Sequence, residues 1–286
     1  MKRILIPSLL PSIMTAGIVL AFTWLAPAAA PAQQRGAAPA AAPASAATAN
    51  APAAEPAPRL PDGHPDLSGV WWTGGDVGGR GYGGGRGRGA RGGPAPVTFN
   101  SLYTPAAAAA AKKLADKDDP TLKCTPTALG TLNVSLFDVG AVGQIISTPK
   151  FVVMLTETFH GYRVVPTDGR KPREDVPPSY RGDSVGHWEG DVFVVDTRNF
   201  TDDTWLHAEG QVSPHSDELR IVERYRRVDK NTLEIEATVT DPKMLTAPWT
   251  VPKQTLVLAP FDQILPLICS GVETKGLMDA AAKQTP

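Results

Sequence analysis

The stretch that decides the fold is LRIVERYRRVDKNTLEIEATV, residues 219–239. Within it, residues 232–239 alternate strictly between apolar and polar side chains, and residues 220–225 alternate loosely. Because side chains on a β-strand point to opposite faces in turn, the pattern predicts two strands, each with one buried and one solvated face. The tripeptide Asp229-Lys230-Asn231 between them is typical of a turn that reverses an antiparallel hairpin.

Other short segments share this composition, being rich in β-branched and aromatic residues and separated by turn residues: 144–147, 151–155, 162–165, 192–196 and 255–258. Regularly spaced strands of this kind predict an all-β, mainly antiparallel domain, built as a barrel-like or sandwich meander. A barrel is favoured because closure removes sheet edges. One short N-terminal helix is expected, which Thr104 would cap, Pro105 would begin and Pro120 would prevent from continuing.

The N-terminal third reads as a leader and a spacer. Lys2 and Arg3 precede a long uncharged run, and small residues follow it, which predicts a signal peptide over residues 1–32. The run is long enough to remain as an anchor, but two prolines interrupt it and cleavage sites follow, so cleavage is favoured. Residues 33–100, rich in Ala and Pro and then in Gly and Arg, predict a disordered lead. Residues 101–286 would form a single β domain, periplasmic or secreted, without stable membrane insertion.

The charge balance bears on the partner. The 286 residues include 28 Lys and Arg against 29 Asp and Glu, so the chain is nearly neutral and does not resemble a dedicated nucleic-acid binder. The tract of Gly and Arg at 74–93 could wrap a single strand, but in an exported protein a solvated loop is the favoured interpretation. The predicted partner is a small organic ligand, with no nucleic acid.

Two cysteines occur, Cys124 and Cys269. An exported chain with two thiols most simply joins them, so a disulfide is predicted between the start of the domain and its C-terminal segment. The competing interpretation is a metal-binding or nucleophilic cysteine. No CxxC motif and no histidine near either cysteine in the sequence supports it.

Two motifs carry a resemblance. The stretches PDGHPDLSGVW at 61–71 and DSVGHWEGDVFVVDT at 183–197 are similar to a functionally uncharacterised family of exported bacterial proteins with PDGxPDLSGVW and SxGxWEGDxxVVDT motifs. The resemblance covers residues 60–73 and 124–259. It implies export and supplies no reaction. Because the resembling sequences run on from the first motif without a Gly and Arg tract, it also implies that the tract is dispensable.

Acid–base residues concentrate after the predicted strand at 192–196. The loops that follow combine Asp203, His207 and His215 within a short stretch, and His160 comes from an earlier strand. A histidine beside a carboxylate is the usual arrangement for general acid–base chemistry. The candidate catalytic residues are therefore His160, His207, His215, Asp196 and Asp203. Asp196 would either cap the next turn or face a cavity, and the histidines could instead be surface residues on unrelated loops.

The candidate ligand-binding residues are Arg163, Trp205 and Arg224. On the strand at 220–227 alternate arginines share one face, which is either solvent-exposed or, if it points into a barrel, suited to an anionic ligand. Histidines from separate strands could hold a metal, but no HxH or HExxH pattern is present, and no cofactor is predicted. The letters GDSVG around Ser184 match a nucleophile elbow without the strand-to-helix setting that such an elbow needs.

Two function classes remain. The chain is expected to be an exported protein that binds a small molecule of unknown identity. The alternative is a periplasmic lyase, isomerase or hydrolase that uses histidine and carboxylate groups. A pH-dependent turnover would distinguish the two.

Overall fold

The computed structural model describes residues 54–74, 97–129, 142–157, 159, 161–173, 175–207, 212–265 and 269. All of them belong to the compact unit Ala51–Pro286. The predicted signal peptide and the Gly and Arg tract lie outside the described residues, apart from Gly74. The described residues form nine strands: β1 Gly69–Trp72, β2 Gly143–Ser147, β3 Phe151–Thr156, β4 Tyr162–Pro166, β5 Asp183–Glu189, β6 Val192–Arg198, β7 Arg220–Arg227, β8 Thr232–Thr240 and β9 Trp249–Leu258.

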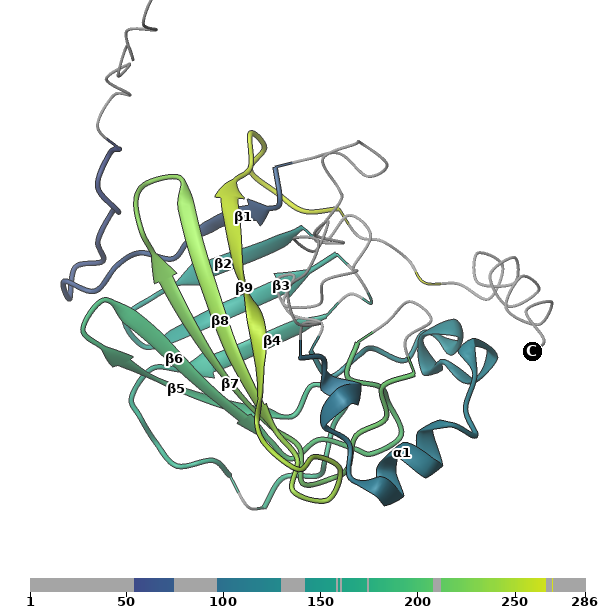
Figure 1. Ribbon diagram of the computed structural model, residues 1–286. Helices are drawn as coiled ribbons and strands as arrows, with labels where there is room; N and C mark the ends of the chain where they lie inside the picture. Colours follow the sequence, from purple (N-terminus) through teal and green to yellow (C-terminus); the bar gives the residue numbers. More distant parts are fainter. Residues whose placement is uncertain are drawn as a thin grey trace, which may run out of the picture. The chain divides into compact units, whose positions relative to one another are not determined.

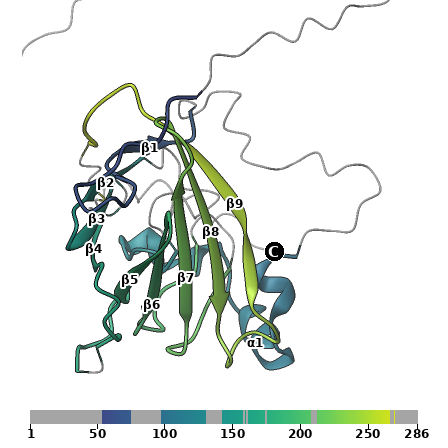
Figure 2. The same cartoon turned by 90° about the vertical axis from the view of Figure 1, so that its left-hand side faces the viewer.

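The strands form one antiparallel sheet in the order β4-β3-β2-β1-β9-β8-β7-β6-β5. The sheet curves into a nearly closed barrel, so that its two end strands, β4 and β5, come close to each other (Figures 1 and 2). The prediction of an all-β antiparallel domain is confirmed, and the barrel-like alternative is the one that forms. Every neighbouring pair is consecutive in the chain except β1 and β9, which pair through Trp71 with Leu258.

Local chemistry fixes the hairpins. Between β5 and β6, Gly190 adopts a φ of 60°, which a glycine reaches without strain. Between β7 and β8, the Asp229 carboxylate accepts a hydrogen bond of 2.8 Å from the Asn231 backbone N–H, closing the predicted turn. These turns lie at one end of the barrel, here called the hairpin end. The opposite end, where β6 stops and β7 begins, is called the loop end.

The strand β1 corrects the predicted domain boundary. Residues 69–72 were expected in the disordered lead, yet β1 lies between β2 and β9, and Trp71 is fully buried in the core. Its indole N–H donates to the Leu67 carbonyl at 3.0 Å. The ordered domain therefore begins before residue 101, because the apolar SGVW segment buries more surface than the Gly-rich and Pro-rich residues around it can.

The residues before β1 cross the hairpin end as a strap, defined as residues 55–68. Arg59 binds Asp191 at the β5–β6 turn through two hydrogen bonds of 2.9 and 2.8 Å. His64 stacks on Trp188, with ring centroids 4.7 Å apart. Arg227 donates to the strap carbonyls of Asp66 and Ser68. Residues of the segments 61–71 and 183–197 thus contact each other in space.

The loop end is covered by a second layer. The short helix α1, Pro105–Ala111, is capped by Thr104 as predicted, and the 3-10 turns Phe99–Leu102, Asp116–Asp118 and Pro120–Lys123 flank it. Leu129 donates through its backbone to Leu206 at 2.9 Å, which ties this layer to the loop between β6 and β7. The predicted disulfide between Cys124 and Cys269 is confirmed. No helix among the described residues is long and apolar enough to cross a membrane.

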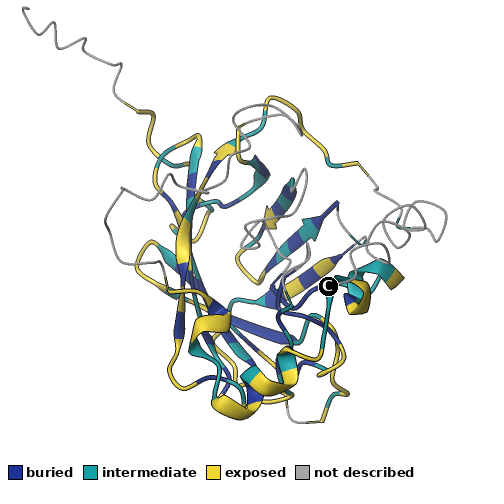
Figure 3. Cartoon of the chain, turned by 45° about the vertical axis from the view of Figure 1, so that its right-hand side comes forward, coloured by how far each residue is buried: buried dark blue, intermediate teal, exposed yellow. Residues whose placement is uncertain are grey.

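Burial alternates along the strands, as Figure 3 shows. The barrel interior receives Phe193 and Val195 from β6 and Ile221 and Tyr225 from β7, all of them buried. Arg220, Arg224 and Arg226 of β7 take the other face, whereas Arg227 shares the buried face and is 6% exposed.

Candidate functional site

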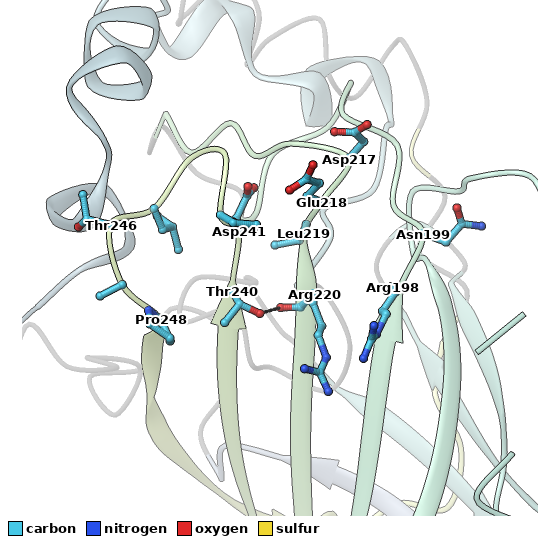
Figure 4. A pocket seen from close by; sticks show the side chains of 13 residues that line it. Arg198, Asn199, Asp217, Glu218, Leu219, Arg220, Thr240, Asp241, Thr246 and Pro248 are labelled. Carbon is cyan, nitrogen blue, oxygen red and sulfur yellow. Dashed lines mark hydrogen bonds between the residues drawn. The ribbon is translucent and has the colours of Figure 1, made fainter. Parts of the chain in front are cut away.

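A groove of about 620 Å³ lies at the loop end (Figure 4). It is formed by the ends of β6, β7, β8 and β9 and by the two loops that join them. The residues that line it are Arg198, Asn199, Asp217, Glu218, Leu219, Arg220, Thr240, Asp241, Pro242, Leu245, Thr246, Ala247 and Pro248. This strand-end groove combines charged side chains with a wall of prolines and alanine.

Two arginines of the groove share one carboxylate. Arg220 donates to Asp196 from Nε at 2.8 Å and from Nη2 at 3.0 Å, and Arg198 donates to it from Nε at 3.3 Å and from Nη2 at 3.0 Å. Burial raises the pKa of Asp196, but the hydrogen bonds from Arg220 and Arg198 outweigh burial and hold that pKa below its ordinary value. Asp196 is therefore ionised at neutral pH and fixes both guanidinium groups.

The other rim of the groove is acidic. Lys243 forms ion pairs with Asp217 at 2.7 Å and with Glu218 at 3.2 Å. Below this rim the buried Asp241 accepts hydrogen bonds from the backbone N–H and the hydroxyl of Ser216, at 2.7 and 2.6 Å, and from the Met244 N–H at 3.1 Å. Asp241 thus holds together the two loops that border the groove.

The structure buries two of the predicted histidines, and both belong to the loop between β6 and β7. His207 and His215 lie on two arms of the loop between β6 and β7, which are joined by a bridge between Trp205 and Pro214. The Ser213 hydroxyl lies 3.4 Å from Nδ1 of His207. His160 lies outside the described residues. The interpretation of surface histidines on unrelated loops is wrong for His207 and His215.

The ring of His215 has a defined tautomer. Its Nδ1 lies 3.0 Å from the Ser216 carbonyl oxygen, which can only accept a hydrogen bond, so Nδ1 carries the proton and Nε2 keeps its lone pair. Nε2 is buried and has no hydrogen-bond partner among the described residues. Burial lowers the pKa of His215, although the negative charges of Asp241, Asp202 and Asp203 oppose the shift. The imidazole is neutral at pH 7.

The two predicted catalytic carboxylates, Asp196 and the exposed Asp203, have different surroundings. Asp203 is one of the carboxylates whose charge acts on His215. Asp196 instead lies on the outer face of β6, bound to its two arginines. Trp205 is buried against the layer at the loop end, where its carbonyl accepts a hydrogen bond from the Ala128 backbone. Trp205 is 4% exposed as a whole residue, so a role in contacting a ligand directly is not supported.

The two predicted ligand-binding arginines take opposite faces. Arg224 is on the outer face and binds Glu189 at 2.8 Å, which confirms the solvent-exposed interpretation of the β7 arginines. Arg163 lies inside the barrel and is bonded to Glu223 at 2.6 Å and to the Tyr225 hydroxyl at 3.2 Å. Tyr225 in turn donates to Glu223 at 2.8 Å. Arg163 therefore belongs to a buried polar cluster.

Charges in this cluster stabilise each other. Burial lowers the pKa of Arg163, but the negative charge of Glu223 more than compensates and raises that pKa above its ordinary value. Burial, helped by the same negative charge, raises the pKa of Tyr225. The cluster is thus a guanidinium, a carboxylate and a neutral phenol, and it ties β4 to β7 across the interior.

Sequence reasoning missed the groove and gave no role to Asp241, Glu223 or Tyr225. A signal for the interior pair was present, because the alternation puts Glu223 and Tyr225 on the buried face with Ile221. No equivalent signal marked Asp241, which follows a strand like many solvated aspartates. Within the described ranges, no group of three or more His, Cys, Asp or Glu side chains is arranged to hold a metal ion.

Comparisons were made with family models, with curated proteins and with solved structures, and none of the three found a match. The chemistry of the chain is therefore argued from its own residues.

Proposed function

We propose that the protein binds a small organic molecule in the strand-end groove. The groove carries the proposal: its volume of about 620 Å³ lies within the range of ~300 to 1,000 Å³ typical of ligand pockets. Its lining has the mixture that such pockets use, an apolar wall with a few fixed polar groups. Pro242, Ala247 and Pro248 supply the wall, and Arg198 and Arg220 supply the polar groups.

The supports of the groove are hydrogen-bonded strands and loops. Four strand ends form its floor, and the outermost rungs of the β7–β8 and β8–β9 ladders lie at Arg220 with Thr240 and at Val239 with Trp249. The loops above the floor are held by the hydrogen bonds of Asp241. Binding residues on hydrogen-bonded strands keep their geometry better than residues on free loops, so little ordering is needed when a ligand arrives.

The proposed place of action is outside the cytoplasm, in a periplasm or in the medium. The disulfide between Cys124 and Cys269 supports this location because such bonds persist in oxidising compartments. The predicted signal peptide points the same way, and an exported binding protein meets its ligand there without membrane insertion.

A ligand screen tests the binding function. Ligand-observed NMR with a library of small organic acids, amides and alcohols is expected to give hits with the wild-type protein. Ala247→Trp, which places an indole in the groove, should abolish them. Ala110→Trp on the exposed face of α1 is the matched control and should keep them. An absence of hits, or hits that survive Ala247→Trp, would contradict the proposal.

A second candidate, acid–base catalysis, is favoured by His215. A neutral imidazole with a fixed Nδ1–H and a lone pair on Nε2 is the form in which a histidine accepts a proton. Because this Nε2 is buried and His215 does not line the groove, the loop that holds it must open before a substrate can reach it. The test is whether any hit from the screen is converted to product over hours. Conversion that rises with pH and is lost in His215→Gln would favour a lyase, isomerase or hydrolase over a binding protein.

A further inference from the structure

We propose that the ligand of the strand-end groove carries a carboxylate, which binds between Arg198 and Arg220; the inference rests on the proposed binding function and names its ligand class. The ligand is a monocarboxylic acid with an apolar body. Three features of the groove argue for it: the hydrogen-bond donors that the arginines leave over, the charge balance around Asp196, and the composition of the opposite rim.

Both arginines have hydrogen-bond donors that Asp196 does not use. Each arginine donates from Nε and Nη2 to Asp196. Neither Nη1 group donates a hydrogen bond to a described residue. Both side chains remain reachable, with 48% of Arg198 and 43% of Arg220 exposed. A guanidinium group recognises a carboxylate through charge-assisted hydrogen bonds, which are about twice as strong as neutral ones. Two such groups fixed side by side form a binding site for a carboxylate.

Arg198 and Arg220 carry more positive charge than Asp196 neutralises. The pairing of β6 with β7 runs through Thr197 and Ile221, so Arg198 and Arg220 stand at the next step, opposite each other. Like charges opposite each other destabilise a sheet unless an anion lies between them. Asp196 supplies one negative charge for two positive ones. One positive charge is left over, and an incoming carboxylate completes the neutralisation.

The opposite rim limits the ligand to one carboxylate. Asp217 and Glu218 share the single ammonium group of Lys243, and the carboxylate of Asp241 lies below them, so this side of the groove keeps two net negative charges. A second carboxylate at that position would be repelled. The groove is also lined by Pro242, Ala247 and Pro248, an apolar surface that the body of a ligand can cover. The groove therefore favours an acid with a hydrocarbon or aromatic body over a dicarboxylic acid.

The experiment compares 3-phenylpropionate with 3-phenylpropionamide, which has the same body and no charge. Isothermal titration calorimetry on the mature, oxidised protein should show the acid binding about tenfold more tightly than the amide, as expected for a hydrogen bond to a charged group. The preference should weaken as salt is added, because the arginines are partly exposed. Arg220→Gln and Arg198→Gln should each remove the preference.

The control is Arg226→Gln. Arg226 lies on the same strand and the same outer face as Arg220, with a similar ion pair to Glu234, but outside the groove. It should keep the full preference, and melting temperatures of all variants verify folding. Equal binding of acid and amide, or a preference that survives both groove variants, would overturn the inference. If that equal binding were lost in Ala247→Trp, the proposed binding function would stand, and if Ala247→Trp changed nothing, both would fail. If neither probe bound, the inference would fail, and the library screen would decide the binding function.

Discussion

At the scale of single residues, His215 shows how one neighbouring group sets the state of a ring. The Ser216 carbonyl fixes the proton on Nδ1, and burial leaves Nε2 without a partner among the described residues. Protonating this nitrogen would place an unpaired N–H and a positive charge in the interior, which is costly even with Asp241 nearby. The folded state therefore prefers the neutral ring.

This preference predicts a pH dependence. Because burial lowers the pKa of His215 below its unfolded value of 6.5, the unfolded chain binds the proton more readily. The stabilisation is fully present above pH 6.5 and is lost as the pH falls toward the folded pKa. Urea unfolding between pH 7.5 and 5.5 should show a larger loss of unfolding free energy for wild type than for His215→Gln. Identical losses would show that the ring is not responsible.

Gly186 is a second residue whose surroundings decide what can replace it. A Cβ atom there would lie 2.5 Å from the Phe193 ring and 2.9 Å from the Val165 side chain, where the ends of the sheet meet. Gly186→Ala should lower the free energy of unfolding by about 1 to 3 kcal/mol through overpacking. Adding Phe193→Leu should recover part of that loss, because the ring is the main obstacle. Strict additivity in thermal unfolding would contradict this explanation.

At the scale of strands and loops, Arg163 holds β4 in place where no backbone ladder joins β4 to β5. β4 and β5 are the two ends of the sheet order, and Arg163 of β4 reaches across the interior to Glu223 of β7 and Thr197 of β6. The side chain thereby holds in place a strand that has a backbone ladder on one side only. Both members of the ion pair are less than 10% exposed.

Breaking this pair should be costly. Arg163→Met leaves Glu223 buried without its counter-ion and should lower the free energy of unfolding by about 3 to 5 kcal/mol. The double variant Arg163→Met with Glu223→Leu should lose less, because no unpaired charge remains. Arg226→Met, which breaks an exposed pair with Glu234, should cost at most about 1 kcal/mol. Denaturant unfolding of the three variants checks the ranking.

Features that depend on neighbours in the chain could be predicted from the sequence, and features that depend on distant segments could not. Alternation along β8 predicted its buried face, and Asp229 and Gly190 predicted turns, because these features depend on neighbours in the chain. The histidines of the β6–β7 loop were predicted as one group for the same reason. The strand-end groove was not predictable, since Arg198, Arg220 and Pro248 meet only after four strands align. Whether Arg163 points inward depends on closure of the sheet, which is not local.

At the scale of the whole domain, the disulfide joins two residues that are far apart in the sequence. It joins Cys124, in the layer at the loop end, to Cys269 beyond β9, 145 positions away in the sequence. On the chain-entropy account, a closed loop of this length stabilises the folded state by about 4 to 5 kcal/mol. Replacing both cysteines by serine should lower the urea midpoint accordingly. Dithiothreitol should lower the urea midpoint of the wild type and leave that of the variant unchanged. Equal midpoints for the oxidised wild type and the variant would show that the disulfide does not stabilise the fold.

The pairing of β1 with β9 bears on the speed of folding. Every other neighbouring pair in the sheet is also consecutive in the chain. The sheet is therefore a circular meander in which the first strand, β1, pairs with the last strand, β9, and in which the ladder is open between β4 and β5. That one pairing must close a loop of nearly the whole domain, and such distant contacts slow folding. A circular permutant opened between β4 and β5, with the segment after β9 joined to the strap, would turn the distant pairing into a hairpin. Its refolding, followed by stopped-flow tryptophan fluorescence, should be faster than that of the natural chain order, with the same final sheet.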